Sequence, residues 1–399
     1  MPCKVVFSLP PAIAAGGMLL LTIIVLLTVL GPSPSPEVKR LQEQRSSEEA
    51  WVASALQQPM LVENDTVADT SLVEEDAKLY SLRFNFTSPE PCISYVSSIP
   101  DLEGLGHAQA NRDFGFLLAA TLNDLGVCFA FPRLNEKKPM KGKITHGRKD
   151  SMAQELALWE MTLGQPEGMT KMKNLNRDNL EVVRFGMYRS VYRAHQLVRQ
   201  QFKPKTLYIF QKSDTHDHCP SAAFWRRHYQ QHRRKEPVQS LFPVGKDMFN
   251  VAIHLRRLDV YSPVQSKMVR VHHDDFFEKV LAQLEPLLPK NAQLYVLSAA
   301  YHKAKHLLIQ QIRNKFPRAQ LLVNTPASAT FHAFVEADVL VMDLSRYSHL
   351  AGLFSQNIKI SSPFRYNTSC DSSWVPVSDD GVLDVVAFKH ALQELLRRK

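Results

Sequence analysis

Three short motifs that often reveal the chemistry of an enzyme are missing from this sequence. It contains no Gly-x-Gly-x-x-Gly and no Gly-x-x-x-x-Gly-Lys-Ser/Thr, so it lacks the fingerprints of dinucleotide-dependent dehydrogenases and of P-loop enzymes. It also contains no Asp-x-Asp, the carboxylate pair with which some transferases hold manganese. We therefore expect any anion site in this chain to be built from its own cationic side chains.

The composition is that of an ordinary globular protein, not of a disordered or fibrous one. Hydrophobic residues make up 45% and charged residues 22% of the 399 residues, which is close to average usage. A chain of this length exceeds one ordinary domain, so we expect two domains of roughly 150 residues with shorter appendages. The formal net charge of +9 favours anionic partners.

The first long hydrophobic run predicts a membrane anchor. No charged side chain occurs from Val5 to Leu30, and a helix of that length can cross a bilayer. A cleavable signal peptide is the alternative, but its apolar region is usually only about 7–15 residues long. We expect a cytosolic tail at 1–11, an anchor at 12–30, and an extended stem at 31–88 that begins with a Pro- and Ser-rich stretch.

The glycosylation sequons and the cysteines suggest that the rest of the chain is lumenal. Asn64, Asn85 and Asn367 each begin an Asn-x-Ser/Thr tripeptide after the anchor. With no second apolar span, the topology would be type II. An even set of four cysteines also follows the anchor and allows up to two disulfides, with buried free thiols as the alternative; the four are Cys92, Cys128, Cys219 and Cys370.

Two series of alternating strands and helices follow the stem and predict parallel α/β sheets. The first series, at 89–244, is less regular, with strands expected at 92–96, 127–131 and 207–210 and helices at 111–125, 190–203 and 224–235. The helix at 224–235 is basic, which is typical of a solvated face and not of a nucleic-acid site in a lumenal domain. The second series, at 245–399, has strands expected at 250–255, 293–297, 320–323, 339–342 and 359–361 and helices at 275–288, 303–316, 327–336, 347–354 and 382–398.

The most informative segment is an expected strand that ends in two arginines. Apolar residues alternate from Val251 to Leu255, and Arg256, Arg257 and Asp259 follow. Ligands of parallel α/β sheets collect outside the carboxyl ends of the strands, and a guanidinium matches phosphate oxygens with two hydrogen bonds. The pair therefore predicts a diphosphate site; the alternative is a set of salt bridges on a solvated surface.

The segment from Val251 to Asp259 resembles the His-x-Arg-Arg-x-Asp element of the fucosyltransferase superfamily. Two other segments are similar to further elements of that family, in the expected order: Gly104-Leu-Gly106-His107 and the strand end Asp343-Leu-Ser345-Arg346-Tyr-Ser348. The resemblance implies a GT-B-like fold, in which two Rossmann-like domains face a cleft. The acceptor domain would be 89–244 and the nucleotide-sugar domain 245–399. Asp343 and Arg346 replace residues that are frequently Ser in the family.

The resemblance also implies roles for the residues of the arginine motif. Arg256 and Arg257 would grip the diphosphate of GDP-fucose, and one of them would be essential for departure of the leaving group. His254 would lie beside the nucleoside, and Asp259 would belong to the same donor site.

The two weaker segments would complete the donor site. Ser345 would hydrogen-bond the phosphate or the sugar, with Ser348 close by at a helix start, where free backbone donors favour anions. Helix capping explains both serines equally well. Gly104, Gly106 and His107 would contribute from the first domain.

These expectations combine in a type II Golgi membrane glycosyltransferase with a lumenal body. It would transfer fucose from GDP-fucose to a glycan or glycoprotein, with inversion and without a metal or other cofactor, because preplaced arginines can stabilise the leaving phosphate. No nucleic-acid partner is expected. The alternatives are a noncatalytic, membrane-anchored sugar-binding protein with the same fold and a transferase that uses another nucleotide sugar.

No catalytic base can be carried over from the family. An inverting transferase benefits from a carboxylate or histidine that removes the acceptor proton. Candidates are Glu103, His107 and Asp113 at the first-domain motif, and His272, His273, Asp274 and Asp275 after the arginine motif. Asp274 or Asp275 is also a natural helix N-cap. The segment Asp214 to Cys219, which includes His216 and His218, offers metal ligands, but no second well-spaced set accompanies it.

Overall fold

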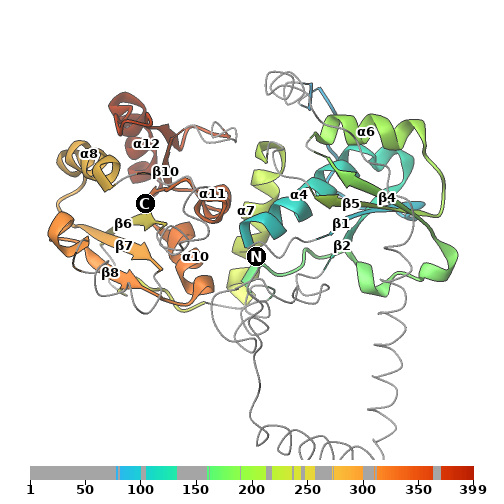
Figure 1. Ribbon diagram of the computed structural model, residues 1–399, viewed down its shortest axis with the longest axis horizontal. Helices are drawn as coiled ribbons and strands as arrows, with labels where there is room; N and C mark the ends of the chain where they lie inside the picture. Colours follow the sequence, from blue (N-terminus) through green and yellow to red (C-terminus); the bar gives the residue numbers. More distant parts are fainter. Residues whose placement is uncertain are drawn as a thin grey trace, which may run out of the picture. The chain divides into compact units, whose positions relative to one another are not determined.

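The computed structural model describes residues 78–79, 81–99, 105–132, 160, 162–188, 190–212, 218–235, 238–243, 248–256, 272, 274–299, 310, 312–362 and 370–399. All of them belong to one compact unit, Met60–Lys399. Two sheets of parallel strands alternate with helices in this unit (Figure 1). The predicted α/β class is confirmed, and the two parallel sheets are consistent with a GT-B-like fold.

The first sheet contains five parallel strands in the order β3-β2-β1-β5-β4. The strands are β1 Ser94–Ser98, β2 Val127–Phe131, β3 Thr170–Lys171, β4 Glu181–Met187 and β5 Thr206–Lys212. Its helices are α4 Leu105–Thr121, α6 Val191–Gln200 and α7 Cys219–Lys235, with short 3-10 helices η1 Asn123–Leu125, η2 Met172–Asn174 and η3 Arg177–Asn179. β2 and β3 lie on one side of β1, and β5 and β4 lie on its other side. The topological switch point is therefore at the carboxyl ends of β1 and β5.

The second sheet contains six parallel strands in the order β11-β10-β9-β6-β7-β8. Counted from its own first strand, this is the order of a dinucleotide-binding Rossmann sheet, with the switch point between β6 and β9. The strands are β6 Phe249–Leu255, β7 Ala292–Ser298, β8 Gln320–Val323, β9 Val339–Val341, β10 Ile358–Ser361 and β11 Trp374–Pro376. The helices are α8 Asp274–Leu284, α10 Ala327–Glu336, α11 Arg346–Phe354 and α12 Val385–Arg398, with η4 Glu285–Leu287 after α8.

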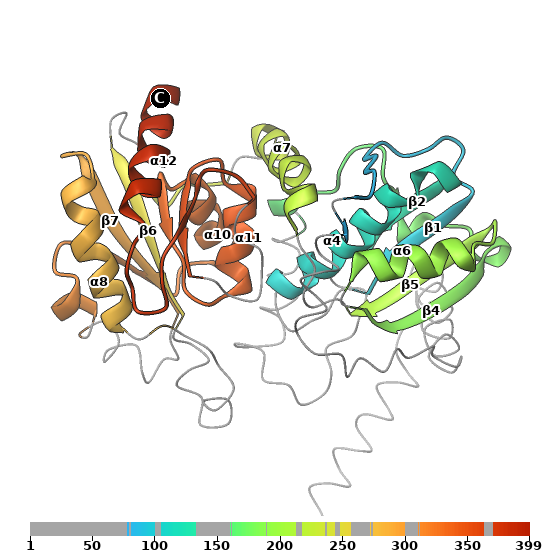
Figure 2. The same ribbon diagram turned by 90° about the horizontal axis from the view of Figure 1, so that it is seen from above.

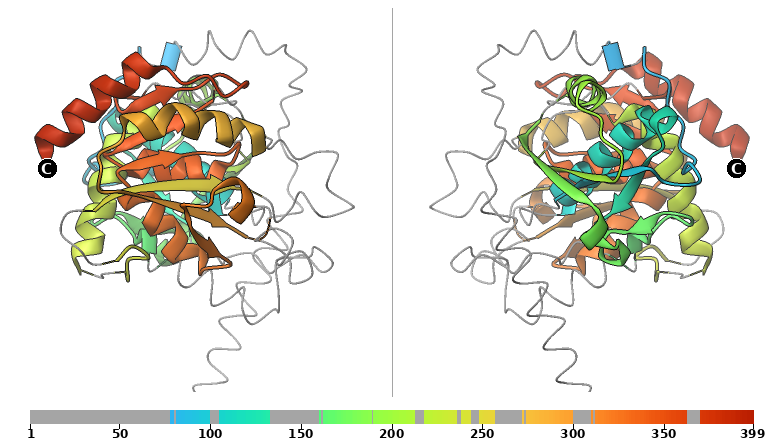
Figure 3. Two further views of the ribbon diagram at one scale, coloured as in Figure 1. Left: turned by 90° about the vertical axis from the view of Figure 1, so that its left-hand side faces the viewer. Right: turned by 90° about the vertical axis from the view of Figure 1, so that its right-hand side faces the viewer.

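Alternation along β6 divides the core of the second sheet between two faces. Val251 and Ile253 are fully buried in a cluster with Phe277 of α8 and Phe388 of α12, whereas Ala252 belongs to a second cluster with Phe334 of α10. Accordingly, α8 and α12 cover one face and α10 and α11 the other (Figure 2); Figure 3 shows the parallel strands from the side of α8. Full burial of each such Phe or Ile side chain stabilises the fold by about 1.5–3 kcal/mol.

The cluster on the α10 and α11 face continues into the first sheet. It includes Phe114 of α4 and Trp225 of α7 together with Phe354 of α11, and the rings of Trp225 and Phe354 lie 6.4 Å apart. Helix α11 packs against both α4 and α7. The two parallel sheets therefore share one hydrophobic core through these helices.

Two disulfides are present. One joins Cys92, just before β1, to Cys128 of β2, and the other joins Cys219, the first residue of α7, to Cys370 after β10. Both disulfides that the four cysteines allow are formed, and the alternative of free thiols is wrong. The second disulfide ties the first-sheet half of the chain to the second.

The predicted tail, anchor and most of the stem lie outside the described residues. No helix of the described part is long and apolar enough to cross a membrane. Leu79, Phe84 and Phe86, which the sequence assigns to the extended stem, instead pack in the cluster that contains Phe114 and Trp225. The Phe86 ring stacks on Phe116 with centroids 5.1 Å apart.

Candidate functional site

Asp343, the residue two positions after β9, ties together the chain segments at the switch point of the second sheet. Its carboxylate accepts hydrogen bonds from three backbone N–H groups: that of Arg256 at 2.8 Å, that of His272 at 2.9 Å and that of Leu344 at 2.9 Å. It is 5% exposed. A serine hydroxyl at this position could not accept all three bonds at such reach, so the carboxylate gives this edge a fixed geometry.

Arg256 reaches the start of α11 from the end of β6. Its guanidinium Nη1 donates to the carbonyl oxygen of Leu344 at 3.1 Å, and the side chain is half-buried. This places a permanent cation beside the amino terminus of α11, where the helix dipole also favours negative charge. The arrangement can attract an anion to the carboxyl edge of the sheet.

Ser345 and Ser348 both take part in the first turn of α11. The Ser345 hydroxyl is the N-cap and accepts from the backbone N–H of Tyr347 at 3.3 Å. The Ser348 hydroxyl donates to the carbonyl of Ser345 at 3.2 Å and is fully buried. Capping therefore accounts for Ser345, and the Ser348 hydroxyl bonds within the helix.

The structure describes the surroundings of only some of the remaining motif residues. His254 lies in β6 with 9% exposure, and its ring packs against Phe334 and Tyr347 with centroids 5.0 and 5.9 Å away. Gly106 lies in α4 so close to α11 that an added Cβ would be 2.8 Å from the Arg346 carbonyl carbon. The Gly-rich segment and the Ser-rich segment thus meet. His107 belongs to α4, but its side chain, like Arg257, Asp259 and Gly104, is outside what the structure describes.

The structure also assembles a buried polar cluster that the sequence did not predict. The carboxylate of Asp113 in α4 is 2.6 Å from His218 Nδ1, and it accepts from the Ser221 hydroxyl at 2.5 Å and from Trp225 Nε1 at 2.6 Å. All four residues are at most 7% exposed. By sequence alone, Asp113 is a candidate base and His218 a candidate metal ligand. Their positions along the chain do not indicate that the two side chains are in contact.

A small cavity lies between His218 and the start of α11. It is about 10 Å³ in volume and is lined by Gly106, Ala110, His218, Arg346, His349, Leu350 and Leu353. Burial, aided by the neighbouring charges of His218 and Arg346, lowers the pKa of His349 to about 3. His349 is therefore neutral at physiological pH. The residues that line this cavity come from α4, from His218 just before α7, and from α11.

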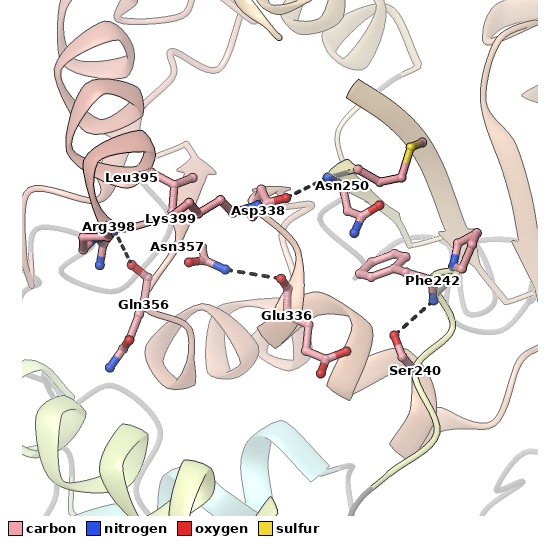
Figure 4. Close-up of a pocket in the computed structure, with 12 residues that line it drawn as sticks. Ser240, Phe242, Asn250, Glu336, Asp338, Gln356, Asn357, Leu395, Arg398 and Lys399 are labelled. Carbon is pink, nitrogen blue, oxygen red and sulfur yellow. Dashed lines mark hydrogen bonds and ion pairs between the residues drawn. The ribbon is translucent and has the colours of Figure 1, made fainter. Parts of the chain in front are cut away.

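A larger cavity, about 500 Å³, lies at the opposite edge of the second sheet. Asn250 lines it at the start of β6, and Asp338 lines it just before β9 (Figure 4). Lys399 Nζ and Asp338 Oδ1 form an ion pair at 2.6 Å, and Arg398 and Glu336 also line the cavity. Its mixed charges give it no preference for an anion, and it lies at the amino ends of the strands, away from the predicted diphosphate site.

The structure describes only some of the other candidate bases and metal ligands. His272 Nε2 is 2.8 Å from the Ser362 hydroxyl, and the ring stacks on Phe276 with centroids 3.7 Å apart. Helix α8 begins at Asp274 and includes Asp275. Among the described residues, no group of three or more His, Cys, Asp or Glu side chains is arranged to hold a metal; Glu103, Asp214, His216 and His273 are not among them.

Comparisons with known proteins give little further information. No protein-family model matches the chain, and no curated protein sequence matches it. Among solved structures, the chain is similar to a mutant of Arabidopsis thaliana FUT1 in complex with GDP, with 13% sequence identity over 73% of this chain and 74% of that one and a TM-score of 0.34. Because this similarity is so low, a functional proposal must rest on the geometry of the site.

Proposed function

We propose that the chain is a glycosyltransferase that binds a nucleoside diphosphate sugar at the switch point of its second sheet. The donor would be GDP-fucose and the acceptor a glycan or glycoprotein, and transfer would proceed with inversion and without a metal. The body would lie in the Golgi lumen on a type II membrane anchor. Arg256 and Arg257 would hold the diphosphate, with Asp259, His254 and the residues of the two weaker motifs around it.

One observation carries this proposal: three separate sequence segments meet at one sheet edge. Arg256 follows β6, Ser345 is the N-cap of α11 after β9, and Gly106 of α4 lies against Arg346 of α11. The carboxyl ends at a switch point are where parallel α/β sheets bind nucleotides. The sequence motifs that resemble the fucosyltransferase elements thus lie together in space.

The chemistry of sugar transfer suits this arrangement. Negative charge builds on the leaving phosphate as the bond to the sugar breaks, and a fixed guanidinium lowers the barrier by stabilising that charge. Asp343 holds the backbone of Arg256 and the start of α11 in register, so the cation and the helix terminus need little rearrangement when the donor binds.

Nucleotide binding by the full chain tests the proposal. Titration calorimetry with GDP, UDP and GDP-fucose is expected to show binding to the wild type, and Arg256→Ala should weaken GDP affinity by about 10-fold or more, because charged hydrogen bonds contribute about 1.5–3 kcal/mol. Arg256→Lys should recover only part of the affinity, since lysine lacks the planar fork.

Arg398→Ala is the matched control, because Arg398 lines the large cavity at the opposite edge of the same sheet. If this substitution lowers GDP affinity and Arg256→Ala does not, the nucleotide binds at the wrong edge for our proposal. Binding of GDP without any turnover of GDP-fucose would favour the noncatalytic sugar-binding alternative, and a preference for UDP would favour another donor.

A further inference from the structure

We propose that the large cavity at the amino ends of the second sheet is a binding site for a neutral sugar unit of a glycan. The cavity lies at the edge of the sheet opposite the proposed donor site, so a sugar held there is separate from the one that would be transferred. The inference therefore does not depend on the proposed function.

The size and position of the cavity suit a small polar ligand. Its volume is about 500 Å³, within the range of roughly 300–1,000 Å³ that is typical of ligand pockets. Four parts of the fold form its walls: the segment that leads into β6, the turn from α10 to β9, the turn from α11 to β10, and the end of α12 (Figure 4). A ligand in this cavity can thus contact four separate segments at once.

The charges of the side chains that line the cavity cancel. Glu336 and Asp338 supply two carboxylates, and Arg398 and Lys399 supply two cations. Asp338 is already paired with Lys399 at 2.6 Å. A ligand with a net charge would lose hydration without meeting a net opposite charge, so the walls favour a neutral ligand.

The side chain of Asn250 makes no hydrogen bond within the part of the chain that the structure describes. Its Oδ1 is buried without a partner, and Nδ2 has none either. Buried polar atoms almost always have a partner, and the terminal torsion of asparagine is soft. A small turn of the amide would bring Oδ1 to the cavity wall, where a ligand hydroxyl could donate to it while Nδ2 donates to a ligand oxygen.

Other polar groups of the cavity are held in place by the fold. Asn357 Nδ2 donates to the carbonyl oxygens of Glu336 and Ala337 at 3.2 and 3.0 Å, which leaves its Oδ1 as an acceptor. Arg398 Nη2 donates to the Gln356 carbonyl at 3.1 Å, and its other N–H groups remain as donors. A hydroxyl both donates and accepts, so a ligand rich in hydroxyls matches a wall that offers both kinds of group in fixed positions.

The remaining wall of the cavity is apolar. Phe242, Met248 and Leu395 line it, and the Phe242 ring is held against Tyr295 with centroids 4.7 Å apart. Apolar walls with a few placed polar groups are typical of ligand pockets, and a sugar ring carries C–H groups as well as hydroxyls. A free amino acid also has no net charge, but its ionic groups would have to compete with the Asp338–Lys399 pair.

Ligand-observed saturation-transfer NMR on the full chain tests the site. The neutral probes are glucose, galactose, N-acetylglucosamine and lactose; glucuronic acid, glucosamine and glycine are the anionic, cationic and zwitterionic probes. We expect at least one neutral sugar to bind more tightly than all three charged probes. Asn250→Ala should weaken its binding about 3- to 10-fold, the effect of losing one or two hydrogen bonds.

The same substitution separates a binding role from a structural one. Because the Asn250 side chain has no partner in the described part of the fold, its removal should leave the thermal midpoint at or above that of the wild type. The GDP affinity should also be unchanged. Asn179→Ala is the matched control, since Asn179 is exposed in η3 of the first half, and it should bind the sugar like the wild type.

A change in the charge of the cavity should change its preference in a predictable direction. Glu336→Gln leaves one more cation than carboxylate and should raise the affinity for glucuronic acid about 2- to 5-fold, the effect of a partly exposed ion pair. Arg398→Gln leaves one more carboxylate and should do the same for glucosamine.

Three results would overturn the inference: no binding of any neutral probe, equal sugar affinity in Asn250→Ala and the wild type, or tighter binding of glycine than of every neutral sugar. A chain that binds a neutral sugar in this way but does not bind GDP would support the inference and remove the proposed function.

Discussion

A buried lysine illustrates how strongly single residues of this fold depend on their surroundings. Lys359 in β10 is 0% exposed; its Nζ donates to the Ser373 hydroxyl and lies 3.5 Å from Asp371. Burial is the main cause that lowers the pKa of Lys359 to about 7. Burial raises the pKa of Asp371, but Lys359, Ser373 and Arg226 lower it to about 2. The carboxylate stays charged, and Arg226 at 2.9 Å pairs with it when Lys359 is neutral.

This shift predicts that the protein gains stability as the pH rises from about 7 toward 10.5. In that range the unfolded chain binds a proton on Lys359 that the folded chain does not, so the free energy of unfolding increases with pH. From pH 7 to 9 the gain should be roughly 2 kcal/mol. Urea unfolding should show this slope in the wild type and not in Lys359→Met. The exposed Lys389→Met controls for loss of one positive charge, and equal slopes in all three proteins would contradict the assignment.

At the scale of helices and strands, the sequence predicts the elements that a local hydrophobic pattern defines. The expected bounds of β2, β8 and α10 agree with the structure, because each is an apolar run with clear ends. β4 was missed because Glu181 and Arg184 interrupt its alternation, although Arg184 is buried in the fold.

Part of the candidate site can likewise be predicted from local sequence patterns, whereas the rest depends on tertiary contacts. Arg256 and Ser345 could be expected at one edge, because parallel strands bring their carboxyl ends together. The clamp at Asp343 and the contact of Asp113 with His218 could not be predicted, because they depend on tertiary contacts between distant segments.

The close approach of α4 to α11 predicts that Gly106→Ala is destabilising. Within a helix, replacing Gly by Ala normally stabilises by about 1 kcal/mol, but here the new Cβ would lie 2.8 Å from the Arg346 backbone. Backbone cannot yield as a side chain does, so we expect a net loss of about 1–3 kcal/mol and weaker GDP binding. Gly352→Ala is the matched control, because its nearest atoms belong to the side chains of Trp374 and Lys359. A thermal midpoint for Gly106→Ala at or above the wild type would show that the helices can separate without cost.

At the scale of the whole molecule, the two halves are joined by more than their shared core. Tyr229 of α7 bonds to His332 Nδ1 at 2.7 Å, Arg226 pairs with Asp371, and Cys219 is bonded to Cys370. All of these contacts involve α7. This helix belongs to the first sheet by sequence and is fixed to the second by covalent and polar bonds, which holds His218, the residue before it, at the cavity next to α11.

Removal of the Cys219–Cys370 disulfide should therefore disturb the union of the halves more than the folding of either one. A cross-link between residues 151 apart restricts the unfolded chain by roughly 5 kcal/mol in the loop-entropy account, against roughly 4 kcal/mol for the 36-residue separation of Cys92 and Cys128. Although these figures are similar, only the first bond joins α7 to the second half. In calorimetric melting, Cys219→Ala/Cys370→Ala should give a broadened or split transition, because α7 loses its covalent bond to the second half. Cys92→Ala/Cys128→Ala should keep a single transition at a lower temperature. The same single transition in both double variants would mean that the shared core alone holds the halves together, and that the disulfide does not position α7.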